Sequence, residues 1–148
     1  PKSFKKDSYK KYFVLNFHLI YQEDLPNNSF VVNNNEYNVP CVFQIWQKKD
    51  IHREQTQTLY PVNFLFVKKH DIPDLSIRRV GVNAGNTSQN TIDKNPQTHY
   101  FIKLKHKTLD IDLISKLNSI NYESSRYTVG PRSISKQELI KEIDDFLL

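Results

Sequence analysis

The first fifty residues alternate between apolar and polar positions in a way that predicts strands. In residues 13–22, FVLNFHLIYQ, large apolar or aromatic side chains recur at every second position, which is the period of a strand with one buried face. Asn33–Asn35 separate two short apolar runs and predict a hairpin tip, because Asn tolerates left-handed backbone angles. The run 39–46, VPCVFQIW, is mostly apolar and predicts a central strand buried on both faces.

Three more strands and two helices are expected in the rest of the chain. Residues 62–67, 75–80 and 99–104 read as strands, and a polar loop over 81–96 separates the last two. The apolar positions from Leu113 to Ile120 share one helical face.

The caps of both helices are also readable from the sequence. Thr108 or Asp110 is the expected N-cap of the first helix, and Ser135 to Glu138 form a capping box at the start of the second. The apolar stripe of that second helix comprises Leu139, Ile140, Ile143, Phe146 and Leu147.

These elements predict an α/β fold with a mixed sheet of about five to seven strands and helices at the C-terminal end. Residues 1–50 would supply the end of the sheet, and residues 51–148 a basic region with the two helices. With 148 residues, the two parts are expected to form one compact unit.

Composition favours an intracellular protein, in the cytoplasm or the nucleus. Cys41 is the single cysteine, so no internal disulfide forms, and a secreted context is disfavoured. Its apolar neighbours predict a buried, unreactive thiol. No apolar stretch approaches the ~20 residues that a membrane-spanning helix needs, so no membrane partner is expected.

The net charge of +5 is unevenly distributed. Residues 51–107 hold nine Lys and Arg against four Asp and Glu, whereas residues 108–148 hold five against seven. A basic centre beside an acidic segment suggests one face for a polyanion. Charge that only keeps the protein soluble is the alternative.

Motifs for metal, phosphate or cofactor chemistry are missing. The three glycines form no phosphate-binding loop. The five histidines are scattered, and one cysteine cannot build a structural zinc site. No paired carboxylates or nucleophile elbow point to hydrolysis.

Two segments carry residues suited to nucleic acid. In IRRVGVNAG, Arg78 and Arg79 suit bidentate contacts to phosphate or guanine, and Asn83 and Asn86 offer paired donors and acceptors for adenine. Lys94 in the same polar loop joins these nucleic-acid-binding candidates. The alternative is a salt-bridged strand end followed by a tight turn.

The second segment, SRYTVGPRSISKQEL, places Arg126 and Arg132 just before a capped helix. A helix N-terminus with a nearby arginine suits an anion, although a plain loop entering a helix is the alternative. Tyr100, after His99, either stacks on a base or fills the core.

The N-terminal third resembles a known family. Pro1–Phe4, the strand at 13–22, the EDLPNNSFVVNNNEYNVP excursion and CVFQIWQKK look like the segment that follows the catalytic motif in class I S-adenosylmethionine-dependent methyltransferases acting on the amino group of adenine in DNA. The resemblance covers residues 1–49. It implies the end of a Rossmann-like sheet with a hairpin, followed by a region, here 75–85 and 125–139, that faces the nucleic acid.

The chain departs from that family in two motifs. The glycine-containing cofactor loop and the Asn/Asp-Pro-Pro-aromatic catalytic motif are absent, so no catalytic or cofactor residue carries over. S-adenosylmethionine is expected only if a missing half completes the site, as an N-terminal part of a longer enzyme or as a separate subunit. The isolated chain is expected to be the non-catalytic, substrate-side part, with DNA as the favoured partner. A non-catalytic nucleic-acid-binding or structural protein, for example in a ribonucleoprotein, is the alternative.

Overall fold

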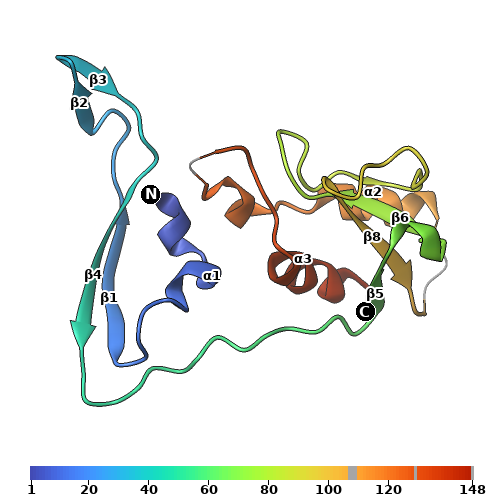
Figure 1. The fold of residues 1–148 in the computed structure, drawn as a ribbon, viewed down its shortest axis with the longest axis horizontal. Helices are drawn as coiled ribbons and strands as arrows, with labels where there is room; N and C mark the ends of the chain where they lie inside the picture. The colour runs from blue at the N-terminus through green and yellow to red at the C-terminus, as the bar shows by residue number, and fades with distance from the viewer. Residues whose placement is uncertain (107–109, 129, 148) are drawn as a thin grey trace. The chain divides into compact units, whose positions relative to one another are not determined.

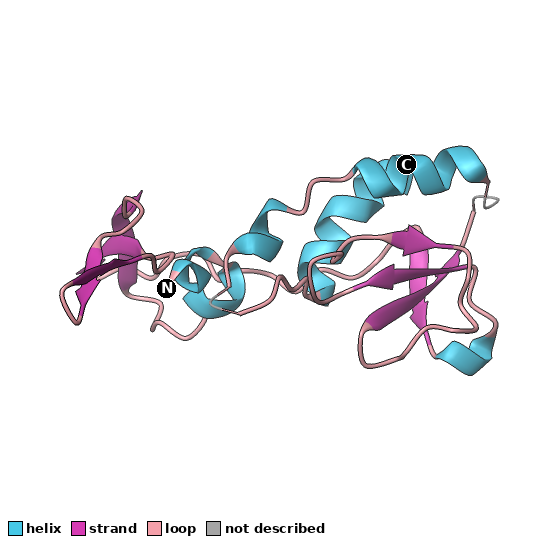
Figure 2. Ribbon diagram, turned by 90° about the horizontal axis from the view of Figure 1, so that it is seen from above, coloured by secondary structure: helices cyan, strands magenta, loops and turns pink. Residues whose placement is uncertain are grey.

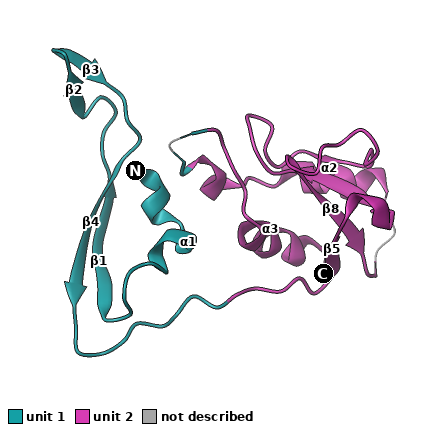
Figure 3. Ribbon diagram, in the orientation of Figure 1, with its two compact units in different colours: residues 1–57, 127–130 teal, residues 58–126, 131–148 magenta. Residues whose placement is uncertain are grey.

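The computed structural model of the chain describes residues 1–106, 110–128 and 130–147. It divides into two compact units, coloured separately in Figure 3. Unit 1 comprises residues 1–57 and 127–130, and unit 2 comprises residues 58–126 and 131–148.

Unit 1 is built on an antiparallel pair of strands, β1 (Phe17–Asp24) and β4 (Val42–Lys48). Between them in the chain lies a small hairpin of β2 (Phe30–Val32) and β3 (Asn35–Tyr37), drawn in Figure 1. The N-terminal residues form two short helical turns, η1 (Lys2–Lys5) and α1 (Asp7–Lys10).

The hairpin predicted around the three asparagines is confirmed. Asn33 and Asn34 connect β2 to β3 and have φ of 51° and 61°. Two successive left-handed residues are what a two-residue turn between twisted strands requires, and Asn adopts this conformation at little cost.

The first strand begins later than its alternation predicts. Residues 13–16 form turns before β1, so the prediction of a strand over 13–22 is wrong at its start. The Arg53 side chain donates hydrogen bonds to the carbonyls of Phe13 and Phe17 at 2.8 and 3.1 Å. The Phe13 ring stacks on Trp46 with centroids 4.3 Å apart. These tertiary contacts hold Phe13 in a loop that covers one face of β4.

The central strand predicted over 39–46 is also corrected. β4 pairs only with β1 among the described residues, and its side chains alternate between half-buried and exposed. Trp46 is half-buried, whereas Phe43 and Ile45 are exposed. Cys41 is partly rather than fully buried. The apolar run therefore predicts a strand correctly. It does not show whether one face or both faces of that strand are buried within unit 1.

Unit 2 contains a four-stranded antiparallel sheet with the strand order β5-β8-β6-β7. The strands are β5 (Phe64–Val67), β6 (Leu75–Arg78), β7 (Thr87–Ser88) and β8 (His99–Leu104). Figure 2 shows α2 (Ile111–Ser119) and α3 (Lys136–Ile143) on one face of this sheet. Three short helical turns, η2 (Lys69–Asp71), η3 (Glu123–Arg126) and η4 (Asp144–Leu147), complete the unit.

The hydrophobic core lies between this sheet and its helices. Phe64, Leu75 and Ile77 are fully buried on the sheet side. Leu117 of α2 and Leu139 of α3 meet them from the helices. Every buried large apolar residue that the structure describes belongs to unit 2, so unit 2 holds the core that positions the site below.

The mixed α/β class is confirmed, but the expected arrangement of strands is not. The described strands form three separate sheets of two, two and four strands, and every pair in them is antiparallel. Residues 49–63 contain no strand and lie between β4 and β5 in the chain. Because no ladder crosses that polar segment, the strands of the first fifty residues and the later ones do not join into one sheet.

Both helix caps are found, within the described residues. Asp110 accepts a hydrogen bond from the Leu113 N–H at 2.7 Å, whereas the other expected cap, Thr108, lies outside the described residues. The capping box between Ser135 and Glu138 is present. Phe146 is 46% exposed, contrary to its place in the predicted apolar stripe, because the helix tightens to a 3-10 turn after Ile143 and rotates the last side chains.

None of the helices in the described ranges is both long and apolar enough to cross a membrane.

Candidate functional site

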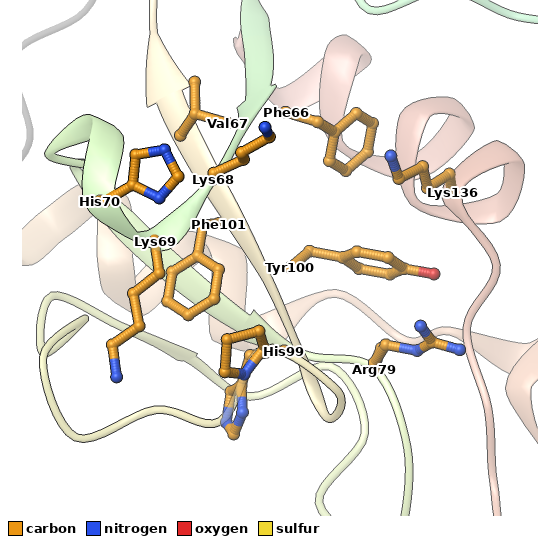
Figure 4. A pocket seen from close by; sticks show the side chains of 11 residues that line it. Phe66, Val67, Lys68, Lys69, His70, Arg79, His99, Tyr100, Phe101 and Lys136 are labelled. Carbon is orange, nitrogen blue, oxygen red and sulfur yellow. The ribbon is translucent and has the colours of Figure 1, made fainter.

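A pocket of about 450 Å³ lies in unit 2 where β5 ends beside β8. The last residue pair of these strands is Val67 with Phe101. The first two residues of β8, His99 and Tyr100, pair with β6 on one side only. The pocket occupies the other side, as Figure 4 shows from close by.

The main chain of His99 is directed into this pocket. Along β8, the Lys105 N–H donates to the Asn63 carbonyl on the β5 side, and the Thr98 carbonyl accepts from Arg79 on the β6 side. Main-chain groups alternate between the two sides of an antiparallel strand. The N–H and C=O groups of the odd-numbered residues of β8 therefore face β5. His99 lies beyond the last residue of β5, so its N–H and C=O face the pocket instead.

Aromatic side chains line the pocket on both sides of β8. Tyr100 and Phe101 are neighbours in the strand, so their rings lie on opposite sides of it. The Phe66 ring lies on the side of Tyr100, and these two rings meet edge to face with centroids 5.5 Å apart. The Tyr100 hydroxyl donates to the Ile134 carbonyl at 2.9 Å, which fixes the ring. Burial raises the pKa of Tyr100, opposed by Arg79 and reinforced by Glu138, so the hydroxyl remains a proton donor at neutral pH.

Two cations lie over these rings. The Lys136 ammonium is 4.6 Å from the centroid of Phe66, and the Arg79 guanidinium is 5.4 Å from that of Tyr100. Both distances fall within the range of cation–π attraction. Figure 4 shows the four side chains on one side of β8. The rings therefore hold two exposed cations at the pocket before any ligand arrives.

Further basic residues line the rest of the pocket. Lys68, Lys69, His70 and His99 border the opposite part of the pocket. Of the residues that the structure describes, no aspartate or glutamate lines it. Glu138 lies close enough to influence Tyr100, but its carboxylate accepts the Ser135 N–H at 2.7 Å in the capping box. The local charge is therefore positive.

His99 is neutral at physiological pH. Its Nδ1 lies 2.9 Å from the Thr98 hydroxyl oxygen and 3.3 Å from the Asn95 carbonyl oxygen. Burial lowers the pKa of His99; the Asn95 carbonyl opposes this, while the positive charges of Arg78 and Lys94 lower it further. The ring contributes a polar surface to the pocket without a full charge.

Among the arginines predicted for binding, only Arg79 lines the pocket. The Arg78 Nε donates to the Val80 carbonyl at 3.0 Å, and the Arg132 Nη1 donates to the Val82 carbonyl at 3.4 Å. Both side chains thus brace the turn after β6. Arg126 lies exposed in η3.

The remaining predicted residues lie outside the pocket lining. Asn83 and Asn86 are exposed, and their main chains close the turn, with the Asn86 N–H donating to the Asn83 carbonyl at 3.1 Å. Lys94 is half-buried and near enough to His99 to lower its pKa. Arg78 and Lys94 therefore add to the field at the pocket without lining it.

Sequence reasoning missed most of the lining. The sequence pattern places Phe66 only in a strand and Lys136 only at the start of a helix, and 70 residues separate them in the chain. One local signal was available, because the basic triplet Lys68-Lys69-His70 directly follows an apolar strand. A cationic cluster at a strand end is a reason to look for an anion at that edge.

Comparison with known families, curated proteins and solved structures finds nothing that matches the chain. Within the described residues, no three histidine, cysteine or carboxylate side chains are grouped to hold a metal ion. The chemistry of the pocket therefore carries the functional argument. Apolar aromatic rings, a main-chain donor and acceptor, and several cations suit an anion that also has a planar, hydrogen-bonding part.

Proposed function

We propose that the chain binds nucleic acid through the pocket of unit 2, as the substrate-side part of an S-adenosylmethionine-dependent adenine DNA methyltransferase. The lining of the pocket supports this proposal, because it combines basic side chains with aromatic rings and contains no carboxylate among the described residues. Phosphates attract such cations without regard to sequence, and aromatic rings stack on bases. A small inorganic anion would gain nothing from the rings.

The methyltransferase part of the proposal draws support from unit 1. The register pairs Tyr21 with Ile45 and Glu23 with Phe43, which places Tyr21, Phe43 and Ile45 on one face of the β1–β4 pair. These three side chains are 42–46% exposed, and the rings of Tyr21 and Phe43 are 6.2 Å apart. A two-stranded sheet is marginal alone, so further strands of a Rossmann-like sheet would stabilise it.

The edge of β4 is suited to receive such a strand. The Cys41 carbonyl accepts from Leu25, and the Lys49 N–H donates to Asn16, so odd-numbered residues near β4 face β1. By alternation, the N–H and C=O groups of Val42, Gln44, Trp46 and Lys48 face the other edge. The cofactor and the catalytic groups would come with the polypeptide that pairs there, since this chain has neither motif.

Nucleic-acid binding is tested by fluorescence anisotropy with a labelled DNA oligonucleotide over a range of salt concentrations. Arg79→Ala combined with Lys136→Ala should weaken binding and reduce the salt slope by about one unit per lost phosphate contact. Lys116→Ala combined with Lys141→Ala is the matched control, because it also removes two positive charges, from exposed helix positions outside the pocket. Equal losses of affinity in both double variants would show that general positive charge, and not the pocket, is responsible for binding. Unchanged affinity in both would show that the pocket does not bind the DNA.

Catalytic context is tested with protein isolated from its native source. That material should transfer a labelled methyl group from S-adenosylmethionine to adenine in DNA, whereas the isolated 148-residue chain should not. An intact-mass measurement on the same material identifies the polypeptide that completes the enzyme. Native material that binds DNA but transfers no methyl group would leave the second candidate, a non-catalytic nucleic-acid-binding protein, which the pocket supports without any partner.

A further inference from the structure

We infer that two copies of this chain associate through the β2–β3 hairpin of unit 1, by antiparallel pairing of β2 with β2 of the second copy. The surface lies outside the pocket, and the inference does not depend on nucleic-acid binding. Three features carry it: the open edge of β2, the absence of charge along that edge, and the match between this edge and a second copy of itself.

The edge of β2 has an unused main-chain donor and acceptor. β2 and β3 form a sheet of their own, and no other described strand pairs with either. Figure 1 shows the hairpin beyond the ends of β1 and β4. In a hairpin closed by a two-residue turn, the residues that flank the turn bond to each other, here Val32 and Asn35. By alternation, the N–H and C=O of Val31 point outward, and no group in the described ranges is hydrogen-bonded to them.

The hairpin also exposes four large apolar side chains. Phe30, Val32 and Tyr37 share one face, because Phe30 pairs with Tyr37 and Val32 lies two residues further along β2. These three are 36–57% exposed, and Val31 on the opposite face is 70% exposed. A two-stranded hairpin is only marginally stable alone. A further strand beside β2 would stabilise it and cover part of this apolar surface.

β2 lacks the features that normally protect an open edge. Residues 25–35 contain no Asp, Glu, Lys, Arg or His, and the strand itself contains no proline. Open edges in native proteins are usually blocked by charged side chains, proline, bulges or a covering segment. Unit 2 shows the contrast, since the Asn118 side chain bonds to the N–H and C=O of Thr87 in its edge strand β7. An unblocked and uncharged edge indicates that another strand covers it.

A second copy of β2 matches this edge in register and in charge. Antiparallel pairing centred on Val31 places the two Val31 residues opposite each other, where they exchange both N–H···O bonds. Phe30 of each copy then lies opposite Val32 of the other, on the apolar face. Pairing through β3 would instead bring the two Glu36 side chains together, and like charges directly opposite each other destabilise a sheet. The symmetric contact therefore uses β2.

The dimer is expected to be weak, because β2 is only three residues long. Stable protein interfaces bury about 1,200–2,000 Å² in total, and a three-residue edge supplies a small part of that area. Association should therefore appear at high protein concentration and reverse on dilution.

Sedimentation velocity of the 148-residue chain over about a hundredfold range of concentration measures this association. The wild type should shift from monomer toward dimer as the concentration rises. Val31→Lys places two like charges opposite each other and should weaken the dimer at least about tenfold, as should Val31→Glu. A mixture of these two variants should dimerise again, because opposite charges then meet. Val82→Lys, at an exposed valine of unit 2, is the matched control and should associate as wild type does.

Cross-linking tests which edge pairs and in which register. With Cys41 replaced by serine, Val31→Cys should form a disulfide-linked dimer with oxidised glutathione, because directly opposite residues that exchange hydrogen bonds have Cα atoms about 5.5 Å apart. Glu36→Cys in the same background is the control. It lies on the same face of the hairpin as Val31, but three strand spacings, about 14 Å, would separate the two copies of it. It should therefore not cross-link.

Several results would overturn the inference. One is a wild-type chain that stays monomeric over the whole range, and another is a dimer that Val31→Lys leaves intact, because a different face would then hold it. Lysine and glutamate variants that stay monomeric when mixed would exclude the symmetric pairing, and equal cross-linking at positions 31 and 36 would exclude the β2 edge. None of these results bears on DNA binding by the pocket, which the anisotropy experiment tests separately.

Discussion

Gly85 lies directly against the ring of Tyr122. A Cβ atom built on Gly85 would be 2.7 Å from Cδ2 of that ring, and the glycine has φ of +104°. Gly85, the second glycine of the IRRVGVNAG segment, thus allows the turn after β6 to pack on the core. This structural role does not depend on a ligand.

Gly85→Ala should therefore destabilise unit 2. The side chain meets the Tyr122 ring and also forces a left-handed backbone on alanine, and strain of this kind costs about 1–3 kcal/mol. Urea unfolding measures the change. Gly130→Ala is the control, since nothing lies within 4 Å of its Cβ position, and it should shift the free energy of unfolding by less than about 0.5 kcal/mol. Equal effects at both positions would contradict the close packing.

Tyr122→Phe should leave unit 2 as stable as wild type or more stable. The residue is 5% exposed, and its hydroxyl has no hydrogen-bond partner among the described residues. Burying a hydroxyl without a partner costs about 1–3 kcal/mol in proteins, so its removal should recover part of that. A loss above about 1 kcal/mol in urea unfolding would mean that a water or another group satisfies the hydroxyl.

The Asn118 side chain, from α2, forms hydrogen bonds with the main chain of Thr87 in β7, as a neighbouring strand would. Its Oδ1 accepts from the Thr87 N–H at 2.8 Å, and its Nδ2 donates to the Thr87 carbonyl at 3.1 Å. Asn118→Ala should destabilise the protein by about 1–3 kcal/mol, because Thr87 is buried and loses its main-chain partner. Asn121→Ala, an exposed position two residues beyond α2, should have little effect. Similar losses of stability in the two variants would show that the hydrogen bonds between Asn118 and Thr87 do not stabilise the protein.

Stability should decrease in mild acid because of His99. Its pKa in the folded protein is lowered from the ordinary value of 6.5, chiefly by burial, so the unfolded chain binds a proton more readily than the folded one. The stabilising contribution is fully present above about pH 6.5 and is lost as the pH falls below that value.

Urea unfolding of wild type and His99→Asn, above and below that pH, measures this contribution. The variant should lose less stability in acid than wild type. His106→Asn, an exposed histidine, should retain the wild-type pH dependence. A His99→Asn variant with an unchanged pH dependence would exclude His99 as the group that titrates.

Ser135→Ala should cost about 1 kcal/mol through loss of the α3 cap. The Ser135 hydroxyl accepts the Glu138 N–H at 3.3 Å, and the Glu138 carboxylate accepts the Ser135 N–H at 2.7 Å. Ser115→Ala, on the exposed side of α2, removes a hydroxyl without a cap and should be nearly neutral. A Ser135→Ala variant within error of wild type would place the start of the helix elsewhere.

The sequence-based predictions succeeded where the signal is local. The Asn33-Asn34 turn, the Ser135 capping box and the strand over 99–104 depend on residues that interact with near neighbours in the chain, so their patterns are readable in a short window. Predictions failed where distant residues decide. Arg53 holds Phe13 in a loop from 40 positions away, and no periodicity within residues 13–22 contains that information.

The candidate site divides in the same way. The sequence predicts the mixed α/β class and the basic middle of the chain, and it offers Arg79 and Tyr100 as candidate residues. It does not show that β5 stops opposite Phe101 or that Phe66 and Lys136 meet beside Tyr100, which is visible only in the fold. The physical reason is that a pocket is bounded by side chains from separate strands and a helix, and core packing, which depends on all of them at once, sets their distances.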